Sequence, residues 1–168
     1  MYRSFRAMRF FWLGIAVCSV LLTGCSGAQR ISHTSAEQAY QEGMERFEAG
    51  DHDTAIEYFR GVFEYGRGNE WAPEAQFQMA RAHEERGQYL LAATEYNRFT
   101  QLYRTHELRP DAEYRRALMY YNASPNYKLD QTDTERAISN FQIYIQRYPN
   151  HEMVRDAEAK VAELRNKL

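Results

Sequence analysis

A block of about a dozen residues occurs three times in this chain, and this repetition constrains the fold more than any other feature. The block is NEWAPEAQFQMA from Asn69, HELRPDAEYRRA from His106 and HEMVRDAEAKVA from His151, at spacings of 37 and 45 residues. A second block, an alanine followed four positions later by an aromatic residue, begins at residues 55, 92 and 137 and has the same two spacings. Both blocks therefore belong to one repeating unit.

Each block has the pattern of an amphipathic helix, because residues four apart lie on the same helix face. Gly50 and Gly87 mark turns between two blocks, and Asp53 and Asp133 are predicted N-caps. Two helices in a unit of somewhat more than 34 residues are typical of a helical solenoid, in which every unit packs on the next.

The pattern resembles the tetratricopeptide repeat. The small residue of that repeat's first helix matches Gly43, Ala80 and Ala117, and its turn glycine matches Gly50 and Gly87. We expect an all-α, tetratricopeptide-like helical solenoid of about three and a half helix pairs after a signal peptide. The repeat domain is predicted at 36–168, with units at about 36–69, 73–105 and 110–149 and a final helix at 152–168.

Two features set the last part of the chain apart. The longer second spacing places the extra residues between Asn122 and Ala137, where ASPNYKLDQTDT has no helical stripe and predicts a long turn. This turn is either an insertion without a task or a contact surface.

The final helix has one apolar side, as expected of a helix that caps a solenoid. Its apolar residues are Val154, Ala157, Val161, Leu164 and Leu168.

The beginning of the chain predicts export and attachment to lipid. Residues 1–9 contain three arginines and no acid, and residues 10–22 are almost entirely apolar. This apolar run is short for a bilayer span, although an uncleaved N-terminal anchor is an alternative. Leu22-Thr23-Gly24-Cys25 resembles the lipobox of bacterial lipoproteins. That resemblance implies a signal peptide at 1–24 and a diacylglycerol with an N-acyl chain on Cys25.

The residues that follow predict where the protein resides. In bacterial lipoproteins an Asp directly after the lipidated Cys tends to retain the protein in the inner membrane. The resemblance, with Ser26 at that position, therefore implies the outer membrane, with the protein facing the periplasm. The small and polar residues up to Ser35 are expected to form a flexible tether, so the segment 25–35 contains the lipidated cysteine and the tether.

The rest of the sequence offers little chemistry. Cys18 would leave with the signal peptide, so no second thiol is expected for a disulfide or a zinc site. The formal net charge is −2 and falls further when the three arginines of the signal are removed, which disfavours nucleic-acid binding. The His-Glu pairs at 106 and 151 lack the second histidine of a zinc protease. We predict no catalytic or metal site and no cofactor beyond the lipid, so an enzyme acting on peptidoglycan is disfavoured.

The segment from Leu129 to Leu168 resembles the third-repeat region of BamD-type outer membrane assembly lipoproteins. The shared features are the long turn before Arg136-Ala137, an aromatic-rich second helix and Arg-Tyr-Pro-Asn at 147–150. The resemblance implies a protein without enzymatic activity that recognises unfolded outer membrane proteins and passes them to a BamA-like insertase. Members of that family usually carry about two more repeats that contact the insertase. This chain stops at Leu168, so it is either short by nature or a fragment.

A different tetratricopeptide lipoprotein, such as a scaffold that coordinates the cell envelope or cell division, is the alternative. In either case the first helices of the units are predicted to line a groove. Aromatic residues there would grip an extended peptide, and Arg81 and Arg115 would hold a carboxylate. The other possibility is that these aromatic residues only pack between helices. The candidate groove residues are Tyr40, Met44, Phe47, Phe77, Arg81, Tyr114, Leu118 and Tyr121.

Overall fold

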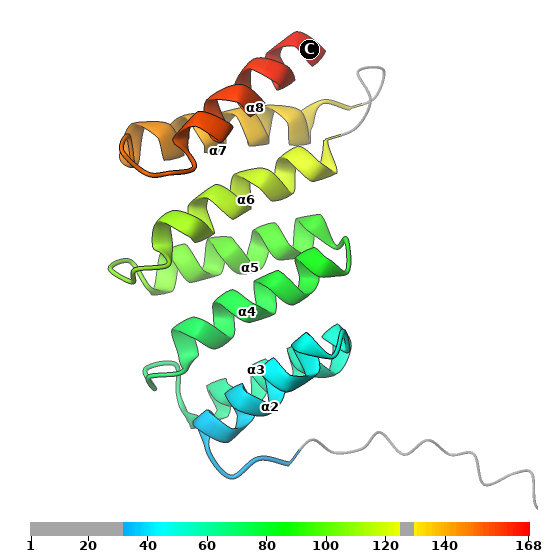
Figure 1. The fold of residues 1–168 in the computed structure, drawn as a ribbon, viewed down its shortest axis with the longest axis vertical. Helices are drawn as coiled ribbons and strands as arrows, with labels where there is room; N and C mark the ends of the chain where they lie inside the picture. The colour runs from blue at the N-terminus through cyan, green and yellow to red at the C-terminus, as the bar shows by residue number, and fades with distance from the viewer. Residues whose placement is uncertain (1–31, 125–129) are drawn as a thin grey trace, which may run out of the picture. The chain divides into compact units, whose positions relative to one another are not determined.

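The computed structural model describes residues 32–124 and 130–168, which form seven α-helices and one short 3-10 helix and contain no strand (Figure 1). The all-α class is therefore confirmed. The predicted signal peptide, Cys25, most of the tether and the tip of the long turn lie outside the described residues. The helices are α2 (Ala36–Glu48), α3 (His52–Val62), η1 (Phe63–Tyr65), α4 (Ala72–Glu85), α5 (Tyr89–Leu102), α6 (Arg109–Ala123), α7 (Thr132–Arg147) and α8 (Val154–Lys167).

Within residues 32–168 each helix packs on the next helix of the chain (Figure 1). The pairs α2–α3, α4–α5 and α6–α7 are followed by the single helix α8, which packs on α7. In addition, α2 contacts α4 and α6 contacts α8, so the first helices of successive pairs are neighbours. Of the helices described, none is long and apolar enough to cross a membrane.

Glycine makes the tight turn inside the first two pairs. Gly50 and Gly87 have φ of +78° and +68°, a conformation that favours a residue without a Cβ. The next amide in each turn donates back to the preceding helix, from Asp51 to the Arg46 carbonyl (2.9 Å) and from Gln88 to the His83 carbonyl (2.9 Å). These turns reverse the chain within three residues.

The two predicted N-caps are wrong. The side chain that caps α3 is that of Asp51, which accepts from the Thr54 amide, and Asp53 lies inside the first turn of α3. The N-cap position of α7 is Gln131, so Asp133 is likewise inside the helix. The carboxylates of Asp53 and Asp133 still lie near the positive end of the helix dipole.

The alanine–aromatic block forms the centre of each pair. Ala55, Ala92 and Ala137 are fully buried, and so are the aromatic residues that follow them, Phe59, Tyr96 and Phe141. Each aromatic side chain contributes about 1.5–3 kcal/mol by leaving water. The small residue of the first helix makes room for it. A Cβ on Gly43 would lie only 2.6 Å from Cε1 of Phe59.

The third pair has a longer connection than the other two. Residues 124–131 join α6 to α7, whereas residues 49–51 and 86–88 suffice in the first two pairs. The loop predicted from the sequence, residues 123–134, was too long at both ends. Ala123 is the last residue of α6, and residues 132–134 form the first turn of α7. The Thr134 hydroxyl is 2.6 Å from that of Ser124, which also accepts from Lys167 of α8 (2.8 Å). The base of the long turn is thus tied to α8.

A buried carboxylate joins α6 to α7. Glu113 is 2% exposed and accepts from Arg109 Nε (3.0 Å), from the Tyr148 hydroxyl (3.2 Å) and from Arg147. Burial, followed by the charge of Glu113, raises the pKa of Tyr148. These donors compensate for removing the carboxylate from water.

The last helix largely follows its predicted pattern. Ala157, Val161 and Leu164 of α8 are buried against the preceding helices. Leu168 is the exception in the predicted stripe, since it follows the end of α8 and is 63% exposed.

Candidate functional site

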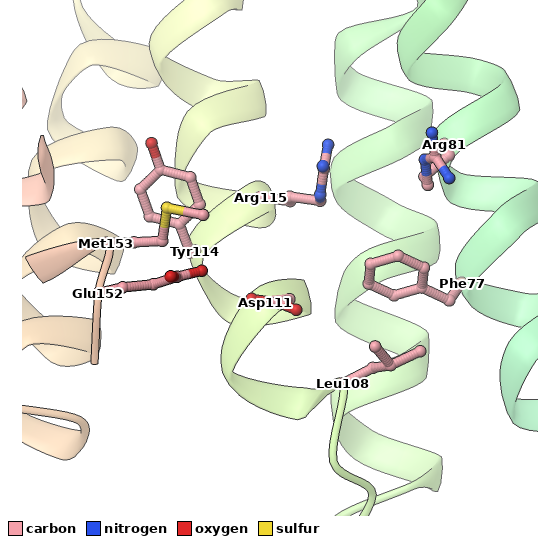
Figure 2. Close-up of a pocket in the computed structure, with 8 residues that line it drawn as sticks. All are labelled: Phe77, Arg81, Leu108, Asp111, Tyr114, Arg115, Glu152 and Met153. Atoms are coloured by element: carbon pink, nitrogen blue, oxygen red, sulfur yellow. The ribbon is translucent and has the colours of Figure 1, made fainter. Parts of the chain in front are cut away.

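A cavity of about 180 Å³ opens where α4, α6 and the start of α8 meet (Figure 2). The helix α4 supplies Phe77 and Arg81, and the residues just before α8 supply Glu152 and Met153. The remaining lining residues lie in or next to the first turns of α6. They are Leu108, Asp111, Tyr114 and Arg115.

The two aromatic residues of the cavity are parts of the core. Phe77 is 6% exposed and packs edge-on against Tyr96 and Phe99, with ring centroids 5.5 and 5.7 Å apart. Tyr114 is 8% exposed and lies against Phe141 and Tyr144 at 5.9 and 5.6 Å. Of the two roles predicted for Phe77 and Tyr114, peptide contact and packing between helices, their burial supports packing. Each exposes only a small part of its ring to the cavity.

The hydroxyl of Tyr114 links α6 to α8, because it donates to Asp156. Burial and this hydrogen bond raise the pKa of Tyr114, so the phenol keeps its proton at neutral pH. A second tyrosine, Tyr121, makes the same kind of link two turns further along, with its hydroxyl 2.7 Å from Glu163. Lys160 of α8 lies over the Tyr121 ring at 4.5 Å.

The two arginines of the cavity differ in how strongly they are engaged. Arg115 donates to both carboxylate oxygens of Glu84, at 3.1 and 3.0 Å, and Glu84 also accepts from the Tyr96 hydroxyl. Arg81 lies over the Phe47 ring at 4.9 Å and donates to the Gln78 side chain at 3.1 Å. In the described parts of the chain Arg81 forms no salt bridge. Its charge is therefore the more accessible one for an anionic ligand.

The opposite side of the cavity is acidic. Asp111 and Glu152 line it across from Arg81 (Figure 2). Asp111 lies 3.8 Å from Nε2 of His151, whose Nδ1 contacts the Tyr144 hydroxyl at 2.6 Å. An extended peptide in this cavity would therefore meet a positive and a negative side.

The other predicted groove residues lie outside this cavity. Tyr40 packs against Phe59 and Trp71, with centroids 6.0 and 5.2 Å apart. Met44 and Phe47 are half-buried against the core of the first pair, as is Leu118 against the cores of the second and third pairs. The cavity brings together Phe77, Arg81 and Tyr114 out of the eight candidate residues.

Sequence reasoning missed four residues of the cavity, namely Leu108, Asp111, Glu152 and Met153. A signal for them was present in the repeated block. Leu108 and Met153 occupy equivalent positions, 45 residues apart. The N-terminal end of one first helix therefore lies beside the next one, and both repeats contribute the same position to one cavity. Across the described residues there is no cluster of three His, Cys, Asp or Glu side chains able to hold a metal ion.

The comparison with known families covers every residue that the structure describes. A family model described as YfiO, outer membrane lipoprotein, matches residues 32–168. The chain belongs to the YfiO family. This membership confirms the resemblance to BamD-type lipoproteins and agrees with the helical repeat fold.

Curated relatives of this YfiO-family chain carry one common name, outer membrane protein assembly factor BamD. The chain is 27% identical over 173 residues to the protein of Caulobacter vibrioides. This match covers 100% of this chain and 57% of the relative. It is 25% identical over 172 residues to that of Vibrio cholerae, covering 96% of this chain and 71% of the relative. It is 27% identical over 149 residues to that of Rickettsia prowazekii, and this match covers 88% of this chain and 59% of the relative. The chain thus spans little more than half the length of the first of these relatives.

Proposed function

We propose that this chain acts in the assembly and insertion of β-barrel proteins into the outer membrane, as a BamD-like component without enzymatic activity. The observation that carries the proposal is the YfiO family match over residues 32–168, together with relatives named as assembly factors. The proposed partners are a BamA-like insertase and peptide segments of unfolded outer membrane proteins. Depleting the chain should lower the amount of folded barrel proteins in the outer membrane, and unchanged amounts after complete depletion would favour an envelope scaffold instead.

We also propose that the protein is held on the periplasmic face of the outer membrane by acyl chains on Cys25. The support is the lipobox in the sequence, since each buried methylene contributes about 0.8 kcal/mol and two or more chains give stable attachment. Replacing Cys25→Ala should move the repeat domain from the membrane fraction to the soluble periplasmic fraction. Cys18→Ala is the matched control and should leave the protein on the membrane. Retention of the Cys25→Ala protein would refute this attachment.

The cavity between α4, α6 and α8 is the proposed binding site for an extended peptide segment. Its support is the combination of apolar lining, from Phe77, Leu108 and Met153, with an arginine that no carboxylate neutralises among the described residues. A side chain of the peptide would enter the cavity, and Arg81 would donate to a peptide carboxylate or carbonyl. Such charge-assisted hydrogen bonds are shorter and stronger than neutral ones.

Binding of a synthetic peptide with an aromatic C-terminal residue tests this site. Arg81→Met should weaken binding roughly tenfold, because a hydrogen bond to a charged group contributes about 1.5 kcal/mol or more. Arg98→Met is the matched control, since Arg98 lies on α5 and pairs with Glu95 of the same helix. Equal losses in both variants would indicate a general effect of charge, and no loss in Arg81→Met would exclude the cavity as the site.

A further inference from the structure

The four residues that precede α2 are attached to the repeat unit, contrary to the expected flexibility of the whole tether. The side chain of His33 is only 7% exposed, although His33 lies outside any helix. It packs at the C-terminal end of α3 and against η1, where its ring meets that of Tyr65 edge-on with centroids 5.5 Å apart. The chain therefore contacts the end of the first helix pair before α2 begins.

Gly61 of α3 forms the seat of the imidazole. A Cβ built on Gly61 would lie 2.3 Å from Nε2 of His33 and 2.8 Å from Cδ2, too close for any side chain. Gly61 has no positive φ, so its backbone conformation does not call for glycine. A glycine inside a helix is less favourable than alanine by about 1 kcal/mol. Among the residues that the structure describes, the three atoms nearest to such a Cβ all belong to His33, so His33 fills the space that the glycine leaves.

Two hydrogen bonds hold His33 in this seat. The Tyr65 hydroxyl donates to the His33 carbonyl oxygen at 3.0 Å and lies 3.1 Å from Nδ1. A phenol has one proton, and the carbonyl receives it, so Nδ1 carries a proton and donates to the Tyr65 oxygen. The other ring nitrogen lies 3.7 Å from the Glu64 carboxylate. Both the backbone and the side chain of His33 are thus engaged.

The link from His33 to α2 is fixed as well. The Thr34 amide and hydroxyl both donate to the Gln38 side chain, at 2.8 and 2.7 Å. The Ser35 hydroxyl accepts from the Gln38 amide at 3.0 Å and caps α2. These hydrogen bonds give the backbone amides of Thr34 and Gln38 an acceptor at the start of α2. The docked His33 and the first turn of α2 therefore form one continuous attached segment.

We propose that His33 is a positioning residue that docks the end of the membrane tether in the Gly61 seat, so that the chain leaves the repeat unit at Ser32. The consequence for the membrane rests on the proposed acylation of Cys25. Seven residues from Cys25 to Ser32 reach at most about 23–25 Å, whereas a tether running free to Ser35 would reach about 33–36 Å. Docking therefore keeps the α3–η1 end of the repeat unit closer to the lipid surface.

Proteolysis of the full chain tests the docking. The Arg30–Ile31 bond lies just before the docked segment, and a protease needs several residues on each side in an extended form. His33→Ala and Gly61→Ala should each speed trypsin cleavage of this bond roughly 5- to 150-fold, which corresponds to the loss of two hydrogen bonds. The displaced imidazole ends a flexible side chain, so Gly61→Ala leaves α3 intact. Gly68→Ala is the matched control, because nothing lies within 4 Å of a Cβ there.

The outcomes separate docking from lipid attachment. Cleavage at the wild-type rate in both variants, or equal acceleration in Gly68→Ala, would overturn the docking. The acceleration should persist in a Cys25→Ala background, since the seat lies within the repeat unit. For the lipidated chain on vesicles, a dye at Glu57→Cys on α3 should be quenched less by labelled headgroups when His33→Ala is present. Unchanged quenching would overturn the positioning role even if docking holds, and failure of Cys25→Ala to release the protein would count against the lipid only.

Discussion

Replacing Gly43 by alanine sets two physical effects against each other. Gly43 lies in the middle of α2, where alanine is intrinsically better by about 0.8–1.0 kcal/mol. The added Cβ would, however, lie 2.6 and 2.7 Å from two ring atoms of Phe59. That ring is fully buried within the core of the first helix pair, so it cannot move aside into solvent. Overpacking of this kind costs about 1–3 kcal/mol.

The steric cost should exceed the gain in helix propensity. Contacts of 2.6 and 2.7 Å place the overpacking cost at the upper end of this range, about 2–3 kcal/mol. After the gain in helix propensity is subtracted, we expect Gly43→Ala to lower the free energy of unfolding by about 1–2 kcal/mol, and the melting temperature by roughly 3–10 °C. Urea unfolding followed by circular dichroism at 222 nm measures the change. Gly68→Ala, at an open position, should alter stability by less than about 0.5 kcal/mol. A Gly43→Ala protein as stable as the wild type would refute the argument that Phe59 requires glycine at this contact.

A double-mutant cycle with Phe59→Leu identifies the cause. Leucine removes the ring atoms that the new methyl group would meet. Phe59→Leu should therefore lower the free energy of unfolding less in the Gly43→Ala background than in the wild type. We expect a coupling energy of about 1–2 kcal/mol, as found for residues in contact. Strict additivity would show that the loss in Gly43→Ala has another origin, such as a distortion of α2.

Two further predictions concern buried polar groups. Glu113→Gln should lower the free energy of unfolding by about 1–3 kcal/mol, because Arg109 and Arg147 lose their charged acceptor. The exposed Glu107→Gln should be neutral in the same urea titration, and an equal loss there would contradict the assignment. Burial, followed by the charge of Glu84, raises the pKa of Tyr96 well above 10, so the unfolded chain releases this proton at a lower pH than the folded chain. Stability should therefore be retained below pH 10 and fall as the pH rises above it, and Tyr96→Phe should reduce that fall; an unchanged pH slope in unfolding at pH 9 to 11 would refute this.

Local sequence patterns predicted the helices well because they record local physics. An alanine and an aromatic residue four positions apart must share a helix face, and the structure buries both in all three pairs. Gly50 and Gly87 were recognisable because the left-handed conformation of a tight turn favours glycine. The predicted caps failed since the residue that becomes the cap depends on where the turn ends, which differs by two residues between Asp51 and Asp53.

The candidate site was harder to predict because it joins residues from different units. Phe77, Arg81 and Tyr114 were named from helix periodicity, and they do line the cavity. Asp111 and Glu152 were not among the predicted site residues, since the repeated block alone does not show which side chains at the starts of α6 and α8 line one cavity. Tyr40, Leu118 and Tyr121 lie outside the cavity because their helices pack against other neighbours, which the sequence pattern does not show.

The sequence by itself determined that this chain forms paired amphipathic helices, that the pairs repeat, and that residues 22–25 resemble a lipobox ending in Cys25. These properties follow from residues close together in the chain, because helix periodicity, turns and cleavage signals act over a few positions. Only the tertiary structure decided that Arg81 keeps its charge free of a carboxylate in the described parts, and that His33 fills the space over Gly61. Those contacts join residues separated by many positions, so their existence depends on how the helices pack.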